Sequence, residues 1–264
     1  MPWQEIIRRC GENRYPGPLG IKNPLRPSGM YHTMLKTVAP YTLQGFFYYQ
    51  GEQDDCRPKG YSTLLSILIH RWRREFQDAN LPFLFVQLPM YTLEDMPEQE
   101  QWSKLREAQL NVFRTVKNTG MAVTLDCGEY GNIHPVDKHP VAHRLALLAR
   151  REVYGEAVSA YGPLYRTSYR SNNTMIIHFD YAEDGLAFHG TPEGFELCDK
   201  NGVWHCAKAE IHGNTICLHC DDVAMPIAAR YAWVNYGAVS LYGKNGIPAS
   251  PFRTNCLALP LATE

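Results

Sequence analysis

The apolar positions of the first 155 residues recur in two alternating patterns. In one pattern they are three to four residues apart, which places them on one face of a helix. Glycine is a common residue at the end of a helix, so Gly120 and Gly155 are the expected ends of the third and fourth predicted helices. The helices predicted in this way cover residues 30–40, 61–78, 101–120 and 139–155.

Short apolar runs lie between these helices. "LPFLFVQL" (81–88) and "MAVTLD" (121–126) are continuous runs of the kind found in strands buried on both faces, and "GFFYYQ" (45–50) predicts a strand that runs into a polar turn. Strands that alternate with helices predict an α/β fold, in which a parallel sheet is covered on both faces.

The polar segments that follow two of these strands are the first candidates for a functional site. In a sheet of this kind, ligands bind at the carboxyl ends of the strands. "QGEQDD" (50–55) and "DCGEYGNIHP" (126–135) both begin where a predicted strand ends. We therefore expect the two segments to meet at one rim of the sheet.

The pattern changes after about residue 160. Runs such as "TMIIHFDY" (174–181) and "GFELCD" (194–199) are short, rich in β-forming residues and separated by Gly, Asn and Asp. Turn signals at this spacing predict an antiparallel, β-sandwich-like region. The sequence thus predicts two domains, residues 1–160 and residues 161–264.

Composition and charge narrow the choice of partner. The 264 residues carry a net charge of −1, so no polybasic surface favours nucleic acid or anionic lipid. No apolar run approaches the roughly 20 residues that a membrane span needs, and the first residues lack the apolar stretch of a signal peptide. Aromatic residues reach 12%, which is common in carbohydrate-handling proteins, although Trp204, Tyr231 and Trp233 are more often core residues in a sandwich.

His134 is the leading candidate for catalysis. It lies at the predicted turn from a strand to a helix, and Pro135 stiffens the chain directly after it. A neutral imidazole near pH 7 is suited to the role of general base. The alternative is a histidine at a helix entry that only hydrogen-bonds its own loop.

The segment formed by Gln50, Gly51 and Glu52 is the second candidate. Gly51 has no Cβ, so its backbone N–H can approach a ligand closely. An oxyanion hole needs such a donor, together with a side-chain amide such as that of Gln50 or Gln53. Glu52 would orient a neighbouring group. The alternative is a polar turn that leaves a sheet.

Two cysteine-based sites are weaker candidates. "CLHC" (217–220) has two thiols and a histidine that can bind zinc, but no second pair of ligands follows at the usual spacing, and the segment alternates as a strand does. Cys56 and Cys127 lack a recognisable motif that would activate a nucleophile. We therefore expect no metal site and no cofactor.

Several of these segments together resemble the sialate O-acetylesterase family of SGNH-type esterases. "GFFYYQGEQD" is similar to the family's strand-to-turn segment, and "IHPVDKHPVAHRLALLAR" is similar to its histidine block. "LPFLFVQLPMY", "WSKLREAQ" and the closing "ARYAWVNYGAVSLYGKNGIPASPFRTN" also match in this order. The resemblance covers residues 17–256.

The resemblance implies a three-layer α/β esterase domain, of which residues 1–160 would be the C-terminal part, followed by a β-rich accessory domain. It implies hydrolysis of O-acetyl esters, typically on the 9-hydroxyl of a sialic acid, by a serine whose proton a histidine accepts. His134 matches that histidine. Gln50, Gly51 and Glu52 match the family's Gln-Gly-Glu segment, where we place oxyanion support. Family members are often exported or lysosomal.

Two features depart from the family's pattern. The early Gly-Gln-Ser-Asn block that carries the nucleophile is missing, as is a Gly-Gly-Thr block, so we expect an incomplete sheet. Either an N-terminal segment that supplies the serine is missing from this chain, or a separate chain supplies that segment, or the protein has lost catalysis. Many such esterases also have an aspartate three residues before the histidine, where this chain has Gly131. Asp126 and Glu129 are the nearby acids, and a backbone carbonyl would be the alternative partner of the imidazole.

Three functions follow from these observations. The leading hypothesis is an esterase that acts on an acetylated sugar, most simply 9-O-acetyl sialic acid. The second is an esterase for another acetylated sugar, such as xylan, and the third is a non-catalytic carbohydrate-binding protein. A nucleophilic serine distinguishes the two esterase hypotheses from the binding-protein hypothesis, because an active esterase must obtain one.

Overall fold

The computed structural model describes residues 28–39, 41–95, 98 and 100–254. The chain divides into two units, residues 1–43 with 70–79, and residues 44–69 with 80–264. In the smaller unit, the predicted helix over 30–40 is confirmed as η1 (Tyr31–Leu35) and α2 (Lys36–Val38). Arg71 donates from Nη2 to the hydroxyl of Tyr31 at 2.8 Å and lies over its ring.

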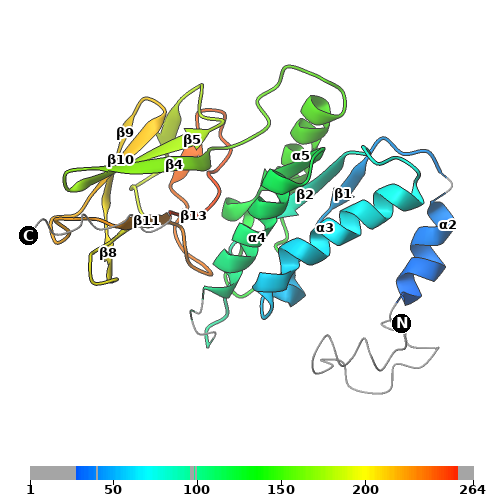
Figure 1. The fold of residues 1–264 in the computed structure, drawn as a ribbon, viewed down its shortest axis with the longest axis horizontal. Helices are drawn as coiled ribbons and strands as arrows, with labels where there is room; N and C mark the ends of the chain where they lie inside the picture. The colour runs from blue at the N-terminus through cyan, green and yellow to red at the C-terminus, as the bar shows by residue number, and fades with distance from the viewer. Residues whose placement is uncertain (1–27, 40, 96–97, 99, 255–264) are drawn as a thin grey trace, which may run out of the picture. The chain divides into compact units, whose positions relative to one another are not determined.

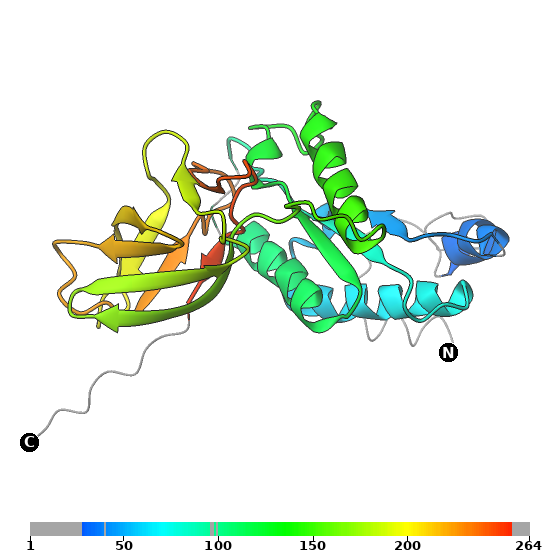
Figure 2. The same cartoon turned by 90° about the horizontal axis from the view of Figure 1, so that it is seen from above.

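The larger unit contains the predicted parallel sheet, with its strands in the order β1-β2-β3. Figure 1 labels β1 and β2, which lie side by side. Every residue of β2 and β3 is buried, which explains their continuous apolar sequences. Figure 2 shows α5 on one face of this sheet and α3 and α4 on the other, so the α/β prediction is confirmed. The elements are β1 (Phe46–Tyr48), η2 (Glu52–Asp54), α3 (Pro58–Glu75), β2 (Phe83–Gln87), α4 (Gln101–Thr115), β3 (Thr119–Val123), η3 (Leu125–Cys127) and α5 (His139–Glu152). The last part of α3, from His70 on, belongs to the smaller unit.

The end that the sequence predicted for α4 is wrong. The helix stops at Thr115, and Gly120 lies inside β3. A Cβ on Gly120 would lie 2.8 Å from Cδ2 of Leu84 on the neighbouring strand. The glycine therefore makes room for a core side chain and does not terminate a helix. Gly155 follows α5 with a φ of +69°, as the sequence predicted.

The second region is built from antiparallel strands, as predicted. Two four-stranded sheets have the orders β4-β5-β10-β9 and β13-β11-β7-β8, and β12 pairs with β6. The strands are β4 (Leu164–Ser171), β5 (Thr174–Asp180), β6 (Leu186–Phe188), β7 (Phe195–Cys198), β8 (Trp204–Cys206), β9 (Lys208–His212), β10 (Thr215–His219), β11 (Ala228–Tyr231), β12 (Leu241–Gly243) and β13 (Phe252–Arg253).

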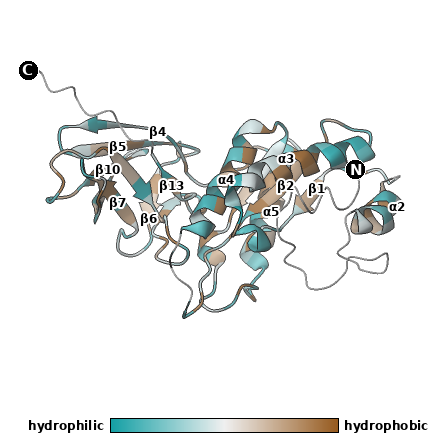
Figure 3. Cartoon of the chain, turned by 60° about the horizontal axis from the view of Figure 1, so that its bottom comes forward, coloured by the Kyte–Doolittle hydropathy of each residue, from teal (hydrophilic) through white to brown (hydrophobic). Residues whose placement is uncertain are grey.

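The core of the parallel sheet includes residues on both sides of the predicted domain boundary. Ala160 and Tyr161 pack with Leu84, Ala122 and Leu148 in one cluster. Figure 3 shows the apolar colour gathered on β2, while polar and apolar positions alternate along α4. The boundary between residues 160 and 161 stays a prediction, and parts of both predicted domains, 1–27 and 255–264, lie outside the described residues.

Arg106 of α4 links the segment after β2 to the connection between β11 and β12. Its guanidinium is fully buried and donates to four backbone carbonyls. These belong to Leu88 (3.1 Å), Pro89 (3.3 Å), Val234 (2.9 Å) and Asn235 (2.9 Å). Because a buried carbonyl without a partner is costly, this side chain fixes two chain segments at the same rim.

Across 28–39, 41–95, 98 and 100–254, no helix combines the length and the apolarity needed to span a membrane.

Candidate active site

His134 lies on the loop that connects β3 to α5. After η3, residues 128–138 lead into the helix. The His134 side chain is exposed and Pro135 is buried. The backbone N–H of His134 donates to Oδ1 of Asn132 at 3.0 Å. The imidazole is thus presented to solvent beyond the carboxyl end of β3, from a backbone that is held in place.

One carboxylate closes this loop. Oε1 of Glu129 accepts the backbone N–H of Val136 at 2.5 Å, and Oε2 accepts Nδ2 of Asn132 at 2.7 Å. These hydrogen bonds, the one from Val136 first, hold the pKa of Glu129 below its ordinary value because they stabilise the ionised form. Since residues 129 and 136 are joined, the loop between them is compact and His134 lies within it.

Two glycines let the loop follow the segment after β2. A Cβ on Gly128 would lie 2.0 Å from the carbonyl oxygen of Met90, so only glycine fits there. The N–H of Gly131 donates to the carbonyl of Thr92 at 3.0 Å. Gly131 has a φ of +74°, a conformation that favours glycine. The loop is therefore anchored to residues 90–92.

Asp126 fixes the start of the same loop. Its carboxylate accepts Nη1 and Nη2 of Arg144 at 2.6 and 2.8 Å, and the hydroxyl of Tyr242 at 3.4 Å. Arg144 is buried and also donates to the carbonyl of Val123 at 2.9 Å. This cluster fixes α5 to the end of β3 and brings β12 to the rim.

Neither acid considered as the partner of His134 reaches its imidazole. Asp126 is paired with Arg144, and Glu129 is occupied by Asn132 and a backbone N–H. Within the described part of the chain, no hydrogen bond or ion pair involves the imidazole of His134. The group that would orient it stays a prediction.

The Gln50 side chain is engaged at both ends of its amide. Oε1 accepts the hydroxyl of Tyr48 at 3.0 Å, and Nε2 donates to Oδ2 of Asp54 at 3.1 Å. Burial, followed by the charges of Asp54 and Glu52, raises the pKa of Tyr48 to about 12, so its hydroxyl stays a donor at neutral pH. In this arrangement the Gln50 amide shapes the turn, and the backbone is left as the candidate donor to an oxyanion.

Gly51 is buried at the start of η2. A Cβ in its place would lie 3.1 Å from Cδ1 of Leu88 and 3.3 Å from the hydroxyl of Tyr61, and its φ is +156°. That hydroxyl donates to the carbonyl of Gln50 at 2.8 Å. Among the described residues, the N–H of Gly51 has no hydrogen-bond acceptor. It is therefore a preorganised backbone donor of the kind that oxyanion holes use.

The turn that carries Gly51 and the loop that carries His134 meet through Tyr49. The ammonium of Lys138 lies 5.4 Å from the centre of the Tyr49 ring. Burial raises the pKa of Tyr49 to about 12, with further contributions from Glu52 and Cys127. The two polar segments thus lie at one rim of the sheet, although no hydrogen bond between described residues joins the imidazole to the turn.

The cysteine-based alternatives have little support. Burial, followed by the charge of Asp126, raises the pKa of Cys127 to about 12, which disfavours the thiolate that a nucleophile requires. Cys217 lies in β10, and the ring of His219 bonds to Asp221 at 2.8 Å. In the described part of the chain, no three His, Cys, Asp or Glu side chains are placed to bind a metal ion.

No serine is paired with a histidine in the described residues, which include every serine of the chain. The buried hydroxyls serve the fold. That of Ser103 donates to the carbonyl of Val234, that of Ser240 to the carbonyl of Glu193, and that of Ser250 accepts the amide of Gln87.

Sequence patterns did not identify the residues that position the two segments. Arg144 and Tyr61 act across 18 and 11 residues of sequence, and both lie at ordinary helical positions. Asn132 was not among the candidates, although its side chain joins Glu129 to His134. The one available signal was an Asn two residues before a candidate histidine, a spacing at which Asn side chains often accept a backbone N–H.

Residues 20–144 match the family described as carbohydrate esterase, sialic acid-specific acetylesterase. The chain is 28% identical over 259 residues to the sialate O-acetylesterase of Mus musculus, covering 88% of this chain and 48% of that protein. The chain is 27% identical to the sialate O-acetylesterase of Homo sapiens, and the match covers 88% of this chain and 50% of that protein. The chain therefore spans about half the length of these curated relatives.

A solved structure gives the same indication. This chain matches the crystal structure of a novel carbohydrate acetylesterase from Xanthomonas citri with 32% sequence identity and a TM-score of 0.83. The match covers 90% of this chain and 56% of that chain. The fold and these matches show that the chain is similar to carbohydrate esterases. Residues 20–144 match the sialate O-acetylesterase family, and the chain as a whole is similar to its curated members.

Proposed function

We propose that this chain carries the histidine and oxyanion parts of a carbohydrate O-acetylesterase site. His134 accepts the proton of a serine hydroxyl that attacks the acetyl carbonyl, and the N–H of Gly51 donates to the oxyanion. The single observation that carries the proposal is the placement of an exposed His134 and the unpaired N–H of buried Gly51 in segments that meet at Tyr49. The match to carbohydrate acetylesterases supports the coarser part of the proposal, hydrolysis of an acetyl ester on a sugar.

The serine would come from a segment outside these 264 residues. Two observations support this part of the proposal. The chain matches about half the length of its relatives, and no described serine pairs with a histidine. The nucleophile would then reach the rim between Gly51 and His134 when the remaining part of the esterase is present.

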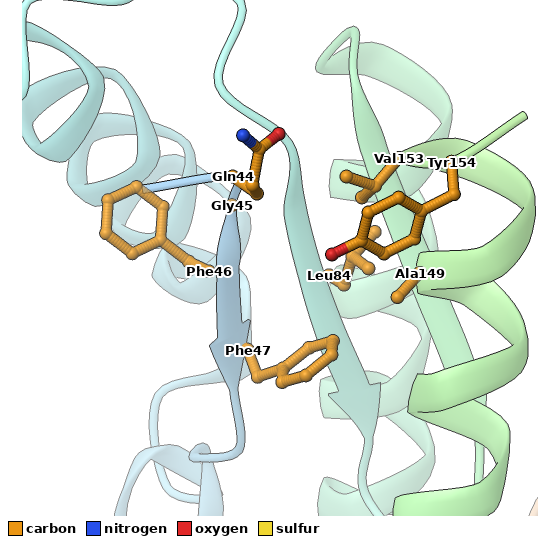
Figure 4. A pocket seen from close by; sticks show the side chains of 8 residues that line it. All are labelled: Gln44, Gly45, Phe46, Phe47, Leu84, Ala149, Val153 and Tyr154. Atoms are coloured by element: carbon orange, nitrogen blue, oxygen red, sulfur yellow. The ribbon is translucent and has the colours of Figure 1, made fainter. Parts of the chain in front are cut away.

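An open apolar surface beside β1 also supports a missing segment. A pocket of about 150 Å³ lies between β1 and the end of α5. Figure 4 shows the ring of Phe47 and the ring of Tyr154 on either side of Leu84 in this pocket. Phe47 is 61% exposed and Tyr154 is 66% exposed. Large apolar side chains on a strand of a parallel sheet are normally covered by another layer.

The substrate would be an acetylated sugar, either 9-O-acetyl sialic acid or another acetylated carbohydrate such as xylan. The test is acetate release from both substrates by two forms of the protein. One is the chain of 264 residues. The other is the longer protein that is made when the coding sequence upstream in frame is expressed together with it. The proposal predicts activity in the longer form alone.

Activity in the short form would place the nucleophile within this chain and contradict the external serine. The absence of activity from both forms would contradict the esterase proposal. The remaining alternative is a carbohydrate-binding protein without catalysis. It would show sugar binding together with no acetate release from the longer form.

A further inference from the structure

Tyr130, in the loop of the candidate histidine, forms an exposed aromatic pair with Tyr236. Their ring centres are 5.7 Å apart, and their planes meet at 81°. The two residues are 58% and 38% exposed. Tyr130 belongs to the closed loop that carries His134, and Tyr236 lies in the connection between β11 and β12. Two distant parts of the sequence therefore place aromatic rings together at the rim.

The backbone on either side of the pair is fixed to one short segment. Gly131, which follows the first ring, donates its N–H to the carbonyl of Thr92 at 3.0 Å. Gly237, which follows the second ring, donates its N–H to Sδ of Met90 at 3.1 Å. Asn235, which precedes the second ring, is 1% exposed and accepts a bond from buried Arg106. Residues 90–92 thus fix the backbone next to each of the two tyrosines.

The pair also presents unused polar groups. Neither phenol hydroxyl hydrogen-bonds to another described residue. A tyrosine supplies a large amphipathic contact surface at a low entropic cost, because its side chain has only two rotatable bonds. Two rings at a right angle form a corner, in which one ring offers its face and the other its edge and hydroxyl. This corner can accept a flat ligand that has an apolar face and a polar edge.

We propose that Tyr130 and Tyr236 form a sugar-binding subsite that holds the pyranose ring of the substrate while its acetyl ester lies at His134. The C–H face of a pyranose packs on one tyrosine, and its hydroxyls meet the polar edge. This inference rests on the proposed esterase function and adds to it the residues that recognise the sugar. It also separates these rings from Tyr231 and Trp233, which are 0% and 2% exposed and belong to the core.

The first test measures sugar binding to the chain of 264 residues and does not depend on activity. The probes are N-acetylneuraminic acid and xylotriose, titrated while the amide resonances of the protein are followed by NMR. Tyr130→Ala and Tyr236→Ala should each weaken binding of the preferred sugar about tenfold, the scale of one aromatic contact. Tyr130→Phe and Tyr236→Phe keep the ring and should retain most of the affinity.

The matched control is Tyr169→Ala. Tyr169 is 50% exposed on β4 and stacks on His178, in the antiparallel region. Its removal should leave sugar binding unchanged. The inference is overturned if neither sugar binds the wild-type chain, if the two alanine variants bind as the wild type does, or if Tyr169→Ala weakens binding equally. The sugar that binds more tightly identifies the substrate class.

The second test separates recognition from chemistry in the longer, active form. Tyr236→Ala should raise KM for the acetylated sugar about tenfold while kcat changes less than threefold, and KM for ethyl acetate should not change. A general loss of kcat for both esters would contradict a recognition role. If acetate release is absent while the binding test succeeds, the esterase proposal fails and the sugar-binding subsite stands.

Discussion

Arg144 of α5 and Asp126 of η3 are joined by two hydrogen bonds, from Nη1 to Oδ1 at 2.6 Å and from Nη2 to Oδ2 at 2.8 Å. The pair lies beneath the loop that carries His134. Because the guanidinium also binds the carbonyl of Val123, the ion pair sets the position of α5 relative to the end of β3. The orientation of the candidate base therefore depends on a residue ten positions after it in the helix.

Arg144→Met should lower the free energy of unfolding by about 2–4 kcal/mol, because it removes the cationic partner of a half-buried carboxylate and the side-chain donor to a buried carbonyl. Urea unfolding measures this difference. Arg150→Met is the matched control, since Arg150 lies on the same helix and pairs with Glu156 in an exposed position. The control should change stability by less than about 0.5 kcal/mol. Equal losses in the two variants would contradict a special role for the Arg144 pair.

Gly128→Ala should displace the start of the His134 loop. The new Cβ would overlap the carbonyl oxygen of Met90, and overpacking of this kind costs about 1–3 kcal/mol. The amide resonances of residues 129–136 should shift in the variant. Gly60→Ala places a methyl group where no atom lies within 4 Å, on helix α3, and should leave these resonances in place. Unchanged loop resonances in Gly128→Ala would show that the contact is not needed.

The thiols should react with iodoacetamide at pH 8 in a defined order. Cys56 and Cys206 are exposed and should be alkylated rapidly. Cys127 should react much more slowly, because burial and Asp126 raise its pKa to about 12. Peptide mass spectrometry follows each site, and unfolded protein gives the control in which the three rates converge. Rapid labelling of Cys127 in the folded chain would reopen its candidacy as a nucleophile.

The Glu129 clamp should open in acid. The bonds from Val136 and Asn132 hold the pKa of Glu129 below its ordinary value, so its contribution is present above the unfolded pKa of about 4.3 and is lost as the pH falls through the lower, folded pKa. The amide resonance of Val136 should therefore move with a midpoint below about 4.3. Glu129→Gln should remove this transition, and Asp137→Asn, in the same loop, should preserve it. A midpoint above that value would contradict the clamp.

The sequence predicted the elements whose burial follows a simple period. Helix α5 and strand β2 have regular apolar patterns, so they were found close to their observed bounds. The end of α4 was wrong because Gly120 serves the packing of Leu84, a contact between strands that no local pattern reveals. The period of the apolar residues indicates which face of each segment is buried, but it does not indicate which other segment packs against that face.

The same limit applies to the site. Strand ends placed the turn at Gly51 and the loop at His134 on one rim, as the contacts of Tyr49 indicate. The roles of Gln50 and Glu129 could not be assigned from sequence, because each depends on a side chain that folding brings near. Tyr48 and Asp54 occupy the Gln50 amide, and Asn132 occupies Glu129.

The most direct test of the account is acetate release by the longer form with His134→Ala. The variant should lose about two to four orders of magnitude in kcat, the usual scale for a general base, while its unfolding midpoint stays near that of the wild type. His139→Ala, which removes an exposed histidine at the start of α5, should retain activity. Full activity in His134→Ala would contradict the assignment of this histidine as the base.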